Sequence, residues 1–475
     1  MRKFTADFET NVNENDCRIW AYATFEIGSE NNFTYGNNME DFINWCANPK
    51  YNFIVYFHNL KFDSEYIISY LLKNGYTHIL DKKDKKDKTF TTLISGMGQF
   101  YCLEIYFQVK DKRHINKVKI YDSFKILDFS VDYIAKEFNL PIRKLKIDYK
   151  EFREVGHILT PEEVDYIRND VEIMARALKI MFDYGLTNMT IGSCALNNYR
   201  KRTNYFNQYY PNLELEVDDY IRQSYKGGFT YLNPLYKEKE VKKGIVLDVN
   251  SLYPSVMYEK PMPFGRPIIF DGEYEYDFLY PLYIQTISCS FKLKEGKIPT
   301  IQLKNSMFFL PNEYLESSNG EIITLTLTSV DLKLFKENYD LKFVNYDGGF
   351  KFKEIYGLFT EYIDYWTEKK ITSKKEGNRA LYLISKKMLN SLYGKFSKSP
   401  HVRSKYPYLD ENGIVNYKIS EDKIEKGLYI PVGAFITAYA REKTIRTSQA
   451  IRDYSIGKYG VDYYIYSDTL ILYTC

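Results

Sequence analysis

The eight residues that decide the fold are Asp248-Val249-Asn250-Ser251-Leu252-Tyr253-Pro254-Ser255, which begin at the end of an apolar run over 244–249. The run is typical of a strand, and Asn250-Ser251 is typical of a turn. A carboxylate at a strand end, followed by a backbone carbonyl and a tight turn, can present one metal site. Tyr253 would lie flat beside whatever binds there. A plain strand–turn–helix without a ligand is the alternative interpretation.

A second string further along the chain reads Lys386-x3-Asn390-x2-Tyr393-Gly394. Its cation, amide and phenol are spaced i, i+4 and i+7, so they share one helix face. Lysine suits a triphosphate as a point charge, and glycine permits close backbone approach. A core helix with incidental polar residues is the alternative.

Composition excludes several classes of protein. The chain has 475 residues with Lys+Arg 65 and Asp+Glu 62, so its net charge of +3 points to no class of partner. At about 150 residues per domain, this length predicts about three domains. Six cysteines without a C-x-x-C pair and five dispersed histidines argue against a zinc finger. No apolar run is long enough to span a membrane, so we expect no membrane partner.

Local charge is less balanced than the total. Between Lys369 and Lys387 the sequence has seven basic residues and one glutamate. When the bulk charge is near zero, a nucleic-acid surface must come from such local clustering. A solvated helix face is the alternative.

The amino-terminal third holds four carboxylates that a fold could bring together. Asp7 and Glu9 are two apart on an expected strand, and hence on one face. Asp63 follows a short apolar strand, and Asp170 lies one helical turn after Tyr166. Converging carboxylates stay ionised only if cations neutralise them, and hard oxygen ligands select Mg²⁺ or Mn²⁺. Two such ions can activate a water and stabilise the leaving oxygen of a phosphodiester. Alternatively, each carboxylate faces solvent by itself.

Periodicity and capping residues locate the main elements. Residues 53–57 predict a buried strand, and Thr160-Pro161-Glu162-Glu163 predicts a helix start with a capping box. Strands alternate with helices up to about residue 185, which predicts an α/β domain. Residues 260–357 are strand-like and punctuated by turns, whereas 358–397 predict two helices.

In this order the amino-terminal fragments resemble the three exonuclease motifs of proofreading DNA polymerases. Asp7-Phe8-Glu9-Thr10 resembles the first motif, Asn59-Leu60-x-Phe62-Asp63 the second and Tyr166-x3-Asp170 the third. The two later strings resemble motifs A and B of family B DNA polymerases.

Two further strings strengthen this second resemblance. Tyr225-Lys226-Gly227-Gly228 is similar to the family's link between its two activities, and Thr437-x3-Arg441 is similar to its primer–template contact. The order of the motifs, their spacing and the long insertion between A and B resemble the protein-primed subgroup carried by small tailed phages. The resemblance covers essentially the whole chain.

The resemblance implies a multidomain α/β and α+β fold, in which an RNase H-like 3′→5′ exonuclease domain precedes a family B palm and fingers with two insertions and without a thumb. The implied divisions are the exonuclease at 1–185, the first part of the palm at 186–259, an insertion that meets a terminal-protein primer at 260–357, the fingers at 358–397, a second insertion that encircles the template and supports strand displacement at 398–425, and the incomplete second part of the palm at 426–475.

The resemblance also implies roles for individual residues. In the exonuclease, the implied catalytic residues are Asp7, Glu9, Asp63, Lys144, Tyr166 and Asp170, with Asp7, Glu9 and Asp170 as metal ligands and Thr10, Asn59, Phe62 and Ser123 holding the single-stranded 3′ end. In the polymerase, Asp248 and Asp468 would be catalytic and would bind metal with the carbonyl of Val249. The implied nucleotide ligands are Tyr253, which would exclude a 2′-hydroxyl, Lys370, Lys386, Asn390 and Tyr393, and the implied DNA contacts are Tyr225, Lys226, Gly227, Thr437 and Arg441.

Cofactors and partners follow from the same resemblance. We expect two Mg²⁺ or Mn²⁺ ions in each active site and dNTP substrates. The expected partners are single-stranded DNA, primer–template DNA and a terminal-protein primer, in the cytoplasm of a bacterial host.

The third polymerase motif departs from the family's pattern. The family has Tyr-x-Asp-Thr-Asp in a hairpin, whereas this chain has Tyr466-Ser467-Asp468-Thr469-Leu470 and stops at Cys475. Because a metal ligand of the family is replaced by leucine, we expect this chain to extend a primer poorly by itself. An exonuclease alone is one alternative. The other is a DNA- and terminal-protein-binding fragment that works with a separate carboxy-terminal chain.

Overall fold

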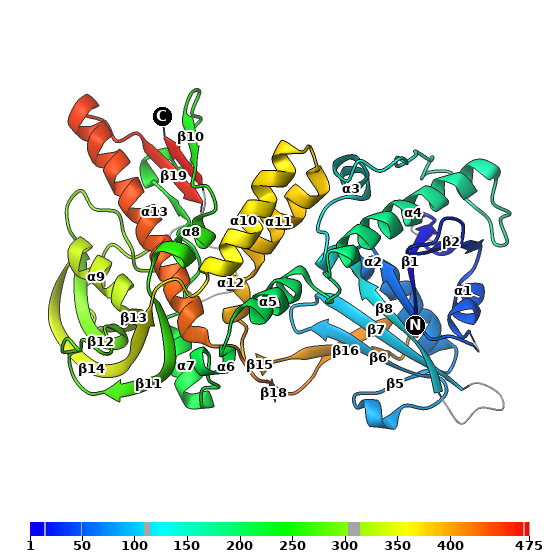
Figure 1. Cartoon of the computed structure of the whole chain (residues 1–475), viewed down its shortest axis with the longest axis horizontal. Helices are drawn as coiled ribbons and strands as arrows, with labels where there is room; N and C mark the ends of the chain where they lie inside the picture. The colour runs from blue at the N-terminus through cyan, green and yellow to red at the C-terminus, as the bar shows by residue number, and fades with distance from the viewer. Residues whose placement is uncertain (14–15, 49, 109–114, 303–313, 469–470, 475) are drawn as a thin grey trace. The chain divides into compact units, whose positions relative to one another are not determined.

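The computed structural model (Figure 1) describes residues 1–13, 16–48, 50–108, 115–302, 314–468 and 471–474. They form two compact units. The first unit comprises Met1–Cys194, Lys369–Lys387 and His401–Glu425, and the second unit comprises Ala195–Glu368, Met388–Pro400 and Lys426–Cys475. Among the described residues, no helix is long and apolar enough to cross a membrane.

A ten-stranded sheet forms the centre of the first unit. Its spatial order is β17 (Val415–Ile419), β16 (Ser404–Leu409), β6 (Thr89–Ser95), β7 (Phe100–Gln108), β8 (Ile115–Asp122), β4 (Phe53–Phe57), β1 (Arg2–Thr10), β2 (Ile19–Glu26) and β3 (Phe33–Gly36), with β5 (Thr77–His78) paired to β6. The pairs β1–β4 and β4–β8 are parallel, and their neighbours β2 and β7 are antiparallel to them. The strand predicted over 53–57 is therefore confirmed as β4, in the middle of the sheet.

Helices cover this sheet. They are α1 (Met39–Cys46), α2 (Leu60–Lys73), α3 (Val131–Glu137) and α4 (Pro161–Asp183). The unit also has two single turns of 3-10 helix, η1 (Lys82–Asp84) and η2 (Ser123–Lys125), and a separate two-stranded sheet of β15 (His401–Val402) and β18 (Lys423–Ile424). α4 begins with the predicted capping box, in which Thr160 and Glu163 each accept from the other's backbone N–H. It packs along β1 and β2 (Figure 1).

The alternation of β1 separates core from site. Phe4 and Phe8 point into an apolar cluster with α1 and α2, where Phe8 meets Phe42 edge-on at 4.9 Å between ring centroids. On the other face, the Thr5 hydroxyl donates to the backbone carbonyl of Val171 in α4, at 2.7 Å. The odd-numbered residues of β1 therefore face α4.

Two four-stranded sheets organise the second unit. One has the order β10 (Ile245–Asp248), β20 (Ile471–Thr474), β19 (Tyr464–Asp468) and β9 (Tyr231–Leu232); the other has the order β11 (Met262–Phe270), β14 (Tyr339–Ile355), β12 (Leu282–Leu293) and β13 (Ile323–Thr328). Its helices are α6 (Phe206–Tyr209), α7 (Leu215–Gln223), α8 (Leu252–Glu259), α9 (Ser329–Asn338), α12 (Tyr393–Phe396) and α13 (Ile430–Tyr459), with the turn η3 (Pro234–Tyr236). Three of the five unit boundaries fall within α5 (Ile191–Arg202), α10 (Thr360–Lys375) and α11 (Arg379–Ser391), and the other two follow Pro400 and Glu425.

The strand-rich character predicted for 260–357 is confirmed over 260–302 and 314–357, and these described residues also contain one helix, α9, that periodicity did not predict. α9 follows β13 directly, and the Thr328 hydroxyl accepts from the backbone N–H of Asp331 at its start. A threonine N-cap thus ends the strand and begins the helix without an intervening loop. The two helices predicted over 358–397 are α10 and α11, and a third, short helix, α12, follows them within the same range.

The pairing of β14 with β12 leaves no room for a side chain at Gly349. A Cβ there would lie 2.0 Å from the backbone oxygen of Ile284. We expect Gly349→Ala to destabilise the second unit by about 1–3 kcal/mol, because the two strands must separate. At Gly457 in α13 nothing lies within 4 Å of the same position. Gly457→Ala should therefore stabilise slightly, since alanine favours helix. Urea unfolding of both variants measures the contrast, and equal stability would contradict it.

Candidate active sites

Three carboxylates meet in the first unit. The ligand oxygens of Asp7, Glu9 and Asp170 all lie within 4.8 Å of one another. Asp7 and Glu9 come from the face of β1 that meets α4, which supplies Asp170. Asp170 is only 2% exposed, and its Oδ1 accepts no hydrogen bond from the residues that the structure describes. A buried, unpartnered carboxylate oxygen aimed at two other carboxylates is a position suited to a cation.

Crowding and burial make the ionised carboxylates unfavourable. Burial, and then the negative charge of Asp170, raise the pKa of Asp7 to about 7. Burial, and then the charge of Asp7, raise the pKa of Glu9 to about 9. The pKa of Asp170 is raised as well, mainly by burial. A divalent cation would offset both burial and repulsion by restoring positive charge.

Asp63 lies beside this trio, in the first turn of α2. It is 3% exposed, and burial followed by the charge of Asp7 raises its pKa well above the usual value. It does not belong to the group whose ligand oxygens lie within 4.8 Å. Of the four carboxylates expected to converge, the structure thus brings three together and buries the fourth within their electrostatic reach.

Lys144 and Tyr166 complete the cluster. The Lys144 Nζ forms an ion pair with Oδ2 of Asp170 and lies 5.5 Å from the centroid of the Tyr166 ring. Burial alone lowers the pKa of Lys144, but the charge of Asp170 raises it above its usual value. The hydroxyl of Tyr166 is hydrogen-bonded to that of Tyr149, a residue that the sequence motifs did not identify.

The residues expected to hold single-stranded DNA lie around β4. Asn59 has a left-handed backbone (φ 69°), and its N–H donates to Oδ1 of Asp122 at 3.1 Å. Phe62 is 51% exposed in α2, so its ring is available for stacking. Ser123 is buried, and its hydroxyl donates to the carbonyl of Phe57 at 2.9 Å. Thr10 ends β1, immediately after Glu9.

The second unit places the polymerase-motif aspartates at one end of a sheet. Asp248 ends β10 and Asp468 ends β19, and both pair with Ile471 of β20, the strand between them. Both aspartates are exposed. Thr469 and Leu470 lie outside the described residues, so the departure expected at Leu470 stays a prediction.

Two tyrosines stack beside this strand end. Tyr253 in α8 and Tyr393 in α12 have ring centroids 3.9 Å apart and planes inclined by 16°. Tyr253 is 8% exposed, which holds its ring in one orientation. Motifs A and B of the sequence therefore contribute one aromatic pair.

The tyrosine–glycine string and the α13 motif meet through Arg441. Its Nη1 donates to the backbone carbonyls of Lys226 and Gly227, both at 2.7 Å, while its Nη2 pairs with Asp331 at 2.6 Å. Thr437 is buried, and its hydroxyl donates to carbonyls of its own helix. The contacts observed for Thr437 and Arg441 lie within the protein, and their role toward DNA stays a prediction, as does that of Tyr225.

The basic cluster lies on α10 and α11. Lys386 and Asn390 are exposed one turn apart on α11, and Lys370 lies on α10. The neighbouring Lys387 pairs with Asp128 of the first unit, at 2.5 Å. The role proposed for these lysines toward a triphosphate stays a prediction.

The raised pKa of Asp7 predicts a dependence of stability on pH. Because folding raises this pKa from 3.8 to about 7, the folded chain holds the proton more tightly than the unfolded chain. The resulting stabilisation is full below about pH 4 and is lost as the pH rises through about 7. In EDTA, we expect the melting temperature of Asp7→Asn to rise relative to the parent over this range. Mg²⁺ near pH 7 should favour the parent instead. Scanning fluorimetry measures both effects, and a pH-independent difference would contradict the prediction.

Comparison with known proteins identifies the family. A family model for DNA polymerase type B, organellar and viral, matches residues 46–472. The DNA polymerase of Bacillus phage M2 is 48% identical over 454 residues, which are 95% of this chain and 78% of that protein. The solved structure of phi29 DNA polymerase with primer–template DNA and incoming nucleotides matches with a TM-score of 0.90 and 45% identity, over 100% of this chain and 80% of that one. The complex of phi29 DNA polymerase with single-stranded DNA also has a TM-score of 0.90. The chain therefore belongs to the type B DNA polymerases, within their protein-primed phage group.

Proposed function

We propose that Asp7, Glu9 and Asp170 form the 3′→5′ exonuclease centre of this DNA polymerase, and that Asp248 and Asp468 form its polymerising centre. The observation that carries the first assignment is the carboxylate trio with the buried, unpartnered Oδ1 of Asp170. This donor set consists of hard oxygen atoms and suits Mg²⁺ or Mn²⁺. When bound, such ions would activate a water and stabilise the leaving oxygen of a phosphodiester.

The protein's own groups would orient the 3′ end in this centre. The Lys144 ammonium fixes one oxygen of Asp170, which leaves the other free to face the neighbouring carboxylates. The exposed ring of Phe62 offers a stacking surface for a terminal base. Asn59, Thr10 and Ser123 would complete the cradle for single-stranded DNA.

In the polymerising centre, the stacked Tyr253 and Tyr393 would form the wall of the dNTP pocket. A buried ring held against a second ring cannot yield to an additional hydroxyl, so Tyr253 would reject ribonucleotides. Lys370, Lys386 and Asn390 would bind the triphosphate, and Asp248, Val249 and Asp468 the two metal ions. Tyr225, Lys226, Gly227, Thr437 and Arg441 would position primer and template, in part through the bonds of Arg441.

The partners proposed for this chain are DNA and a priming protein. The related phi29 DNA polymerase has been solved with single-stranded and with primer–template DNA, which supports both ligands here. Residues 260–357 would meet the terminal protein, and 398–425 would surround the template. Because five relatives that are 47–48% identical to this chain belong to phages of Bacillus, we place this activity in the cytoplasm of a bacterial host.

An exonuclease alone, or a binding fragment, is not favoured as an alternative. The family match over 46–472 includes motifs A and B as well as the second and third exonuclease motifs. The relatives match over 95% of this chain, so the likeness is not confined to its amino-terminal third.

The exonuclease assignment predicts that Asp7→Ala with Glu9→Ala abolishes Mg²⁺-dependent degradation of single-stranded DNA. Loss of two metal ligands should lower the rate at least about a hundredfold, because charge stabilisation carries much of this catalysis. The matched control is Glu30→Ala with Glu40→Ala, which removes two exposed carboxylates. Release of nucleotides from a 5′-labelled strand measures the rate. Equal activity in the parent and the site variant would overturn the assignment.

The polymerase assignment predicts that Tyr253→Val relaxes sugar discrimination. Removing the ring opens the space for a 2′-hydroxyl, so the preference for dNTP over rNTP should fall by about tenfold or more. Tyr258→Val is the control, since Tyr258 lies on the same helix and is 43% exposed. Single-nucleotide incorporation on a primed template, or nucleotide binding where incorporation is slow, measures the preference. An unchanged preference would exclude Tyr253 from this role.

A further inference from the structure

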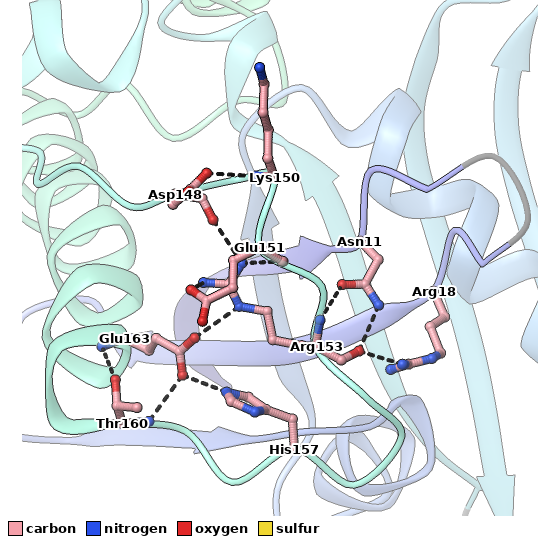
Figure 2. Close-up of polar contacts among 9 residues, drawn as sticks. All are labelled: Asn11, Arg18, Asp148, Lys150, Glu151, Arg153, His157, Thr160 and Glu163. Carbon is pink, nitrogen blue, oxygen red and sulfur yellow. Dashed lines mark hydrogen bonds and ion pairs between the residues drawn. The ribbon is translucent and has the colours of Figure 1, made fainter.

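A network of polar contacts around Arg153 joins three parts of the first unit (Figure 2). The central part is the segment 141–160, which precedes α4 and contains no helix or strand. This segment carries Lys144 and Tyr149, whose side chains contact Asp170 and Tyr166. We infer that Arg153 is a positioning residue of the exonuclease, which anchors this segment to β1 and α4 and thereby holds Lys144 and Tyr149 at the carboxylate trio. The inference rests on the exonuclease function proposed above.

The guanidinium of Arg153 donates hydrogen bonds to backbone carbonyls of its own segment. Its Nη1 donates to the backbone carbonyls of Asp148, at 2.7 Å, and Glu151, at 2.6 Å. Its Nη2 donates to Oε2 of Glu151 at 3.0 Å, and its face lies 4.7 Å from the centroid of the Trp20 ring. Arg153 is 3% exposed, so its guanidinium donates from a buried position to the carbonyls of two exposed residues. In an irregular segment, side-chain donors can pair carbonyls that no backbone ladder pairs.

The backbone of Arg153 binds the end of the strand that carries the catalytic carboxylates. Its N–H donates to Oδ1 of Asn11 at 3.0 Å, and its carbonyl accepts from Nδ2 of Asn11 at 2.8 Å. Asn11 is 2% exposed and lies two residues beyond Glu9. The same carbonyl also accepts from the guanidinium of Arg18. Two reciprocal bonds therefore fix the segment against the end of β1.

The third connection runs to the start of α4 through Glu163. The Nε of Arg153 donates to Oε1 of Glu163 at 3.0 Å, and Oε2 of Glu163 contacts Nε2 of His157 at 2.7 Å and the N–H of Thr160 at 3.0 Å. Glu163 lies seven residues, about two helical turns, before Asp170. The Glu163 carboxylate, which caps α4, thus also binds the guanidinium of Arg153 (Figure 2).

The anchored residue is close in sequence to the two residues that reach the exonuclease centre. Tyr149 lies four residues before Arg153, and Lys144 nine residues before it. Because no backbone ladder holds 141–152, the side-chain bonds of Arg153 restrict where these residues lie.

The first unit offers a matched control on α4. Arg176 pairs with the buried Glu172 at 2.6 Å, four residues apart on one helix. This pair also joins an arginine to a buried glutamate, but it contacts no residue of the segment 141–160 in the contacts that the structure describes. Arg176→Met therefore tests the loss of an arginine–glutamate pair without loss of the anchor.

The experiment compares Arg153→Met, Arg153→Lys and Arg176→Met in the full chain. Hydrogen–deuterium exchange of 141–152 measures anchoring, and steady-state shortening of a 5′-labelled single strand with Mg²⁺, over a range of DNA concentrations, measures kcat and KM. For Arg153→Met we expect about tenfold faster exchange in 141–152 and about a tenfold lower kcat, with KM changed by less than about threefold. Arg176→Met should leave both unchanged. Arg153→Lys keeps the charge but not the planar fork, so it should not restore kcat.

A double-mutant cycle with Lys144→Ala separates positioning from a general loss of stability. If Arg153 acts through Lys144 and Tyr149, Arg153→Met should lower kcat much less when Lys144 is already absent. Equal losses in both backgrounds would overturn the inference, as would unchanged exchange in 141–152 or full rescue by lysine. If Arg153→Met does not fold, Arg153→Lys decides the question. If the parent degrades no DNA, the proposed function has failed, and the exchange measurement still decides whether Arg153 anchors the segment.

Discussion

The repulsion among three carboxylates, held within 4.8 Å of one another in the first unit, constrains the rest of that unit. Each carboxylate would lie more favourably in water, so the packing of the elements that carry them must hold them in place. The strand β1 does this by alternation. Phe8, between Asp7 and Glu9, meets Phe42 and Phe57 edge-on at 4.9 and 4.8 Å. A register shift of one residue would exchange the aromatic and acidic faces of β1. The register that packs the phenylalanines into the core is therefore also the one that places the carboxylates together.

The two acidic sites of the chain differ in how deeply their carboxylates are buried. In the first unit, Asp170 is buried and its repulsion is partly offset by Lys144. In the second unit, Asp248 and Asp468 are exposed on strands that flank β20, where water screens their charges. The selectivity that we propose for that second site would depend on the stacked rings of Tyr253 and Tyr393 rather than on buried charge. Cation binding and folding are therefore expected to be coupled more strongly at the first site than at the second.

Sequence patterns predicted the helices and strands that are specified by residues close together in the chain. The capping box of Thr160 and Glu163 spans four residues, and the strand over 53–57 is a continuous apolar run, so both could be recognised from neighbours in the chain. The carboxylates that meet were predicted through their motifs, since spacing alone places Asp7 with Glu9 but not with Asp170. The hairpin of β16 and β17, which joins the sheet where Ser404 pairs with Ser95, left no local pattern. Pairing between residues so distant in sequence is decided by the tertiary fold.

Arg153 was missed for the same reason, and its contacts explain why an arginine stands there. Its bonds to Asn11 join residues 142 positions apart, so no periodicity or motif could indicate them. The segment 141–160 has no backbone ladder, and one planar guanidinium donates to two of its carbonyls while pairing with Glu163. A lysine would bring the same charge but not donors in fixed directions. The location of Lys144 at the carboxylates is thus tied to how an irregular segment satisfies its own backbone. Arg153 touches none of the three carboxylates by any contact that the structure describes. We infer that it nevertheless affects the geometry of the exonuclease centre, through the backbone hydrogen bonds of its segment.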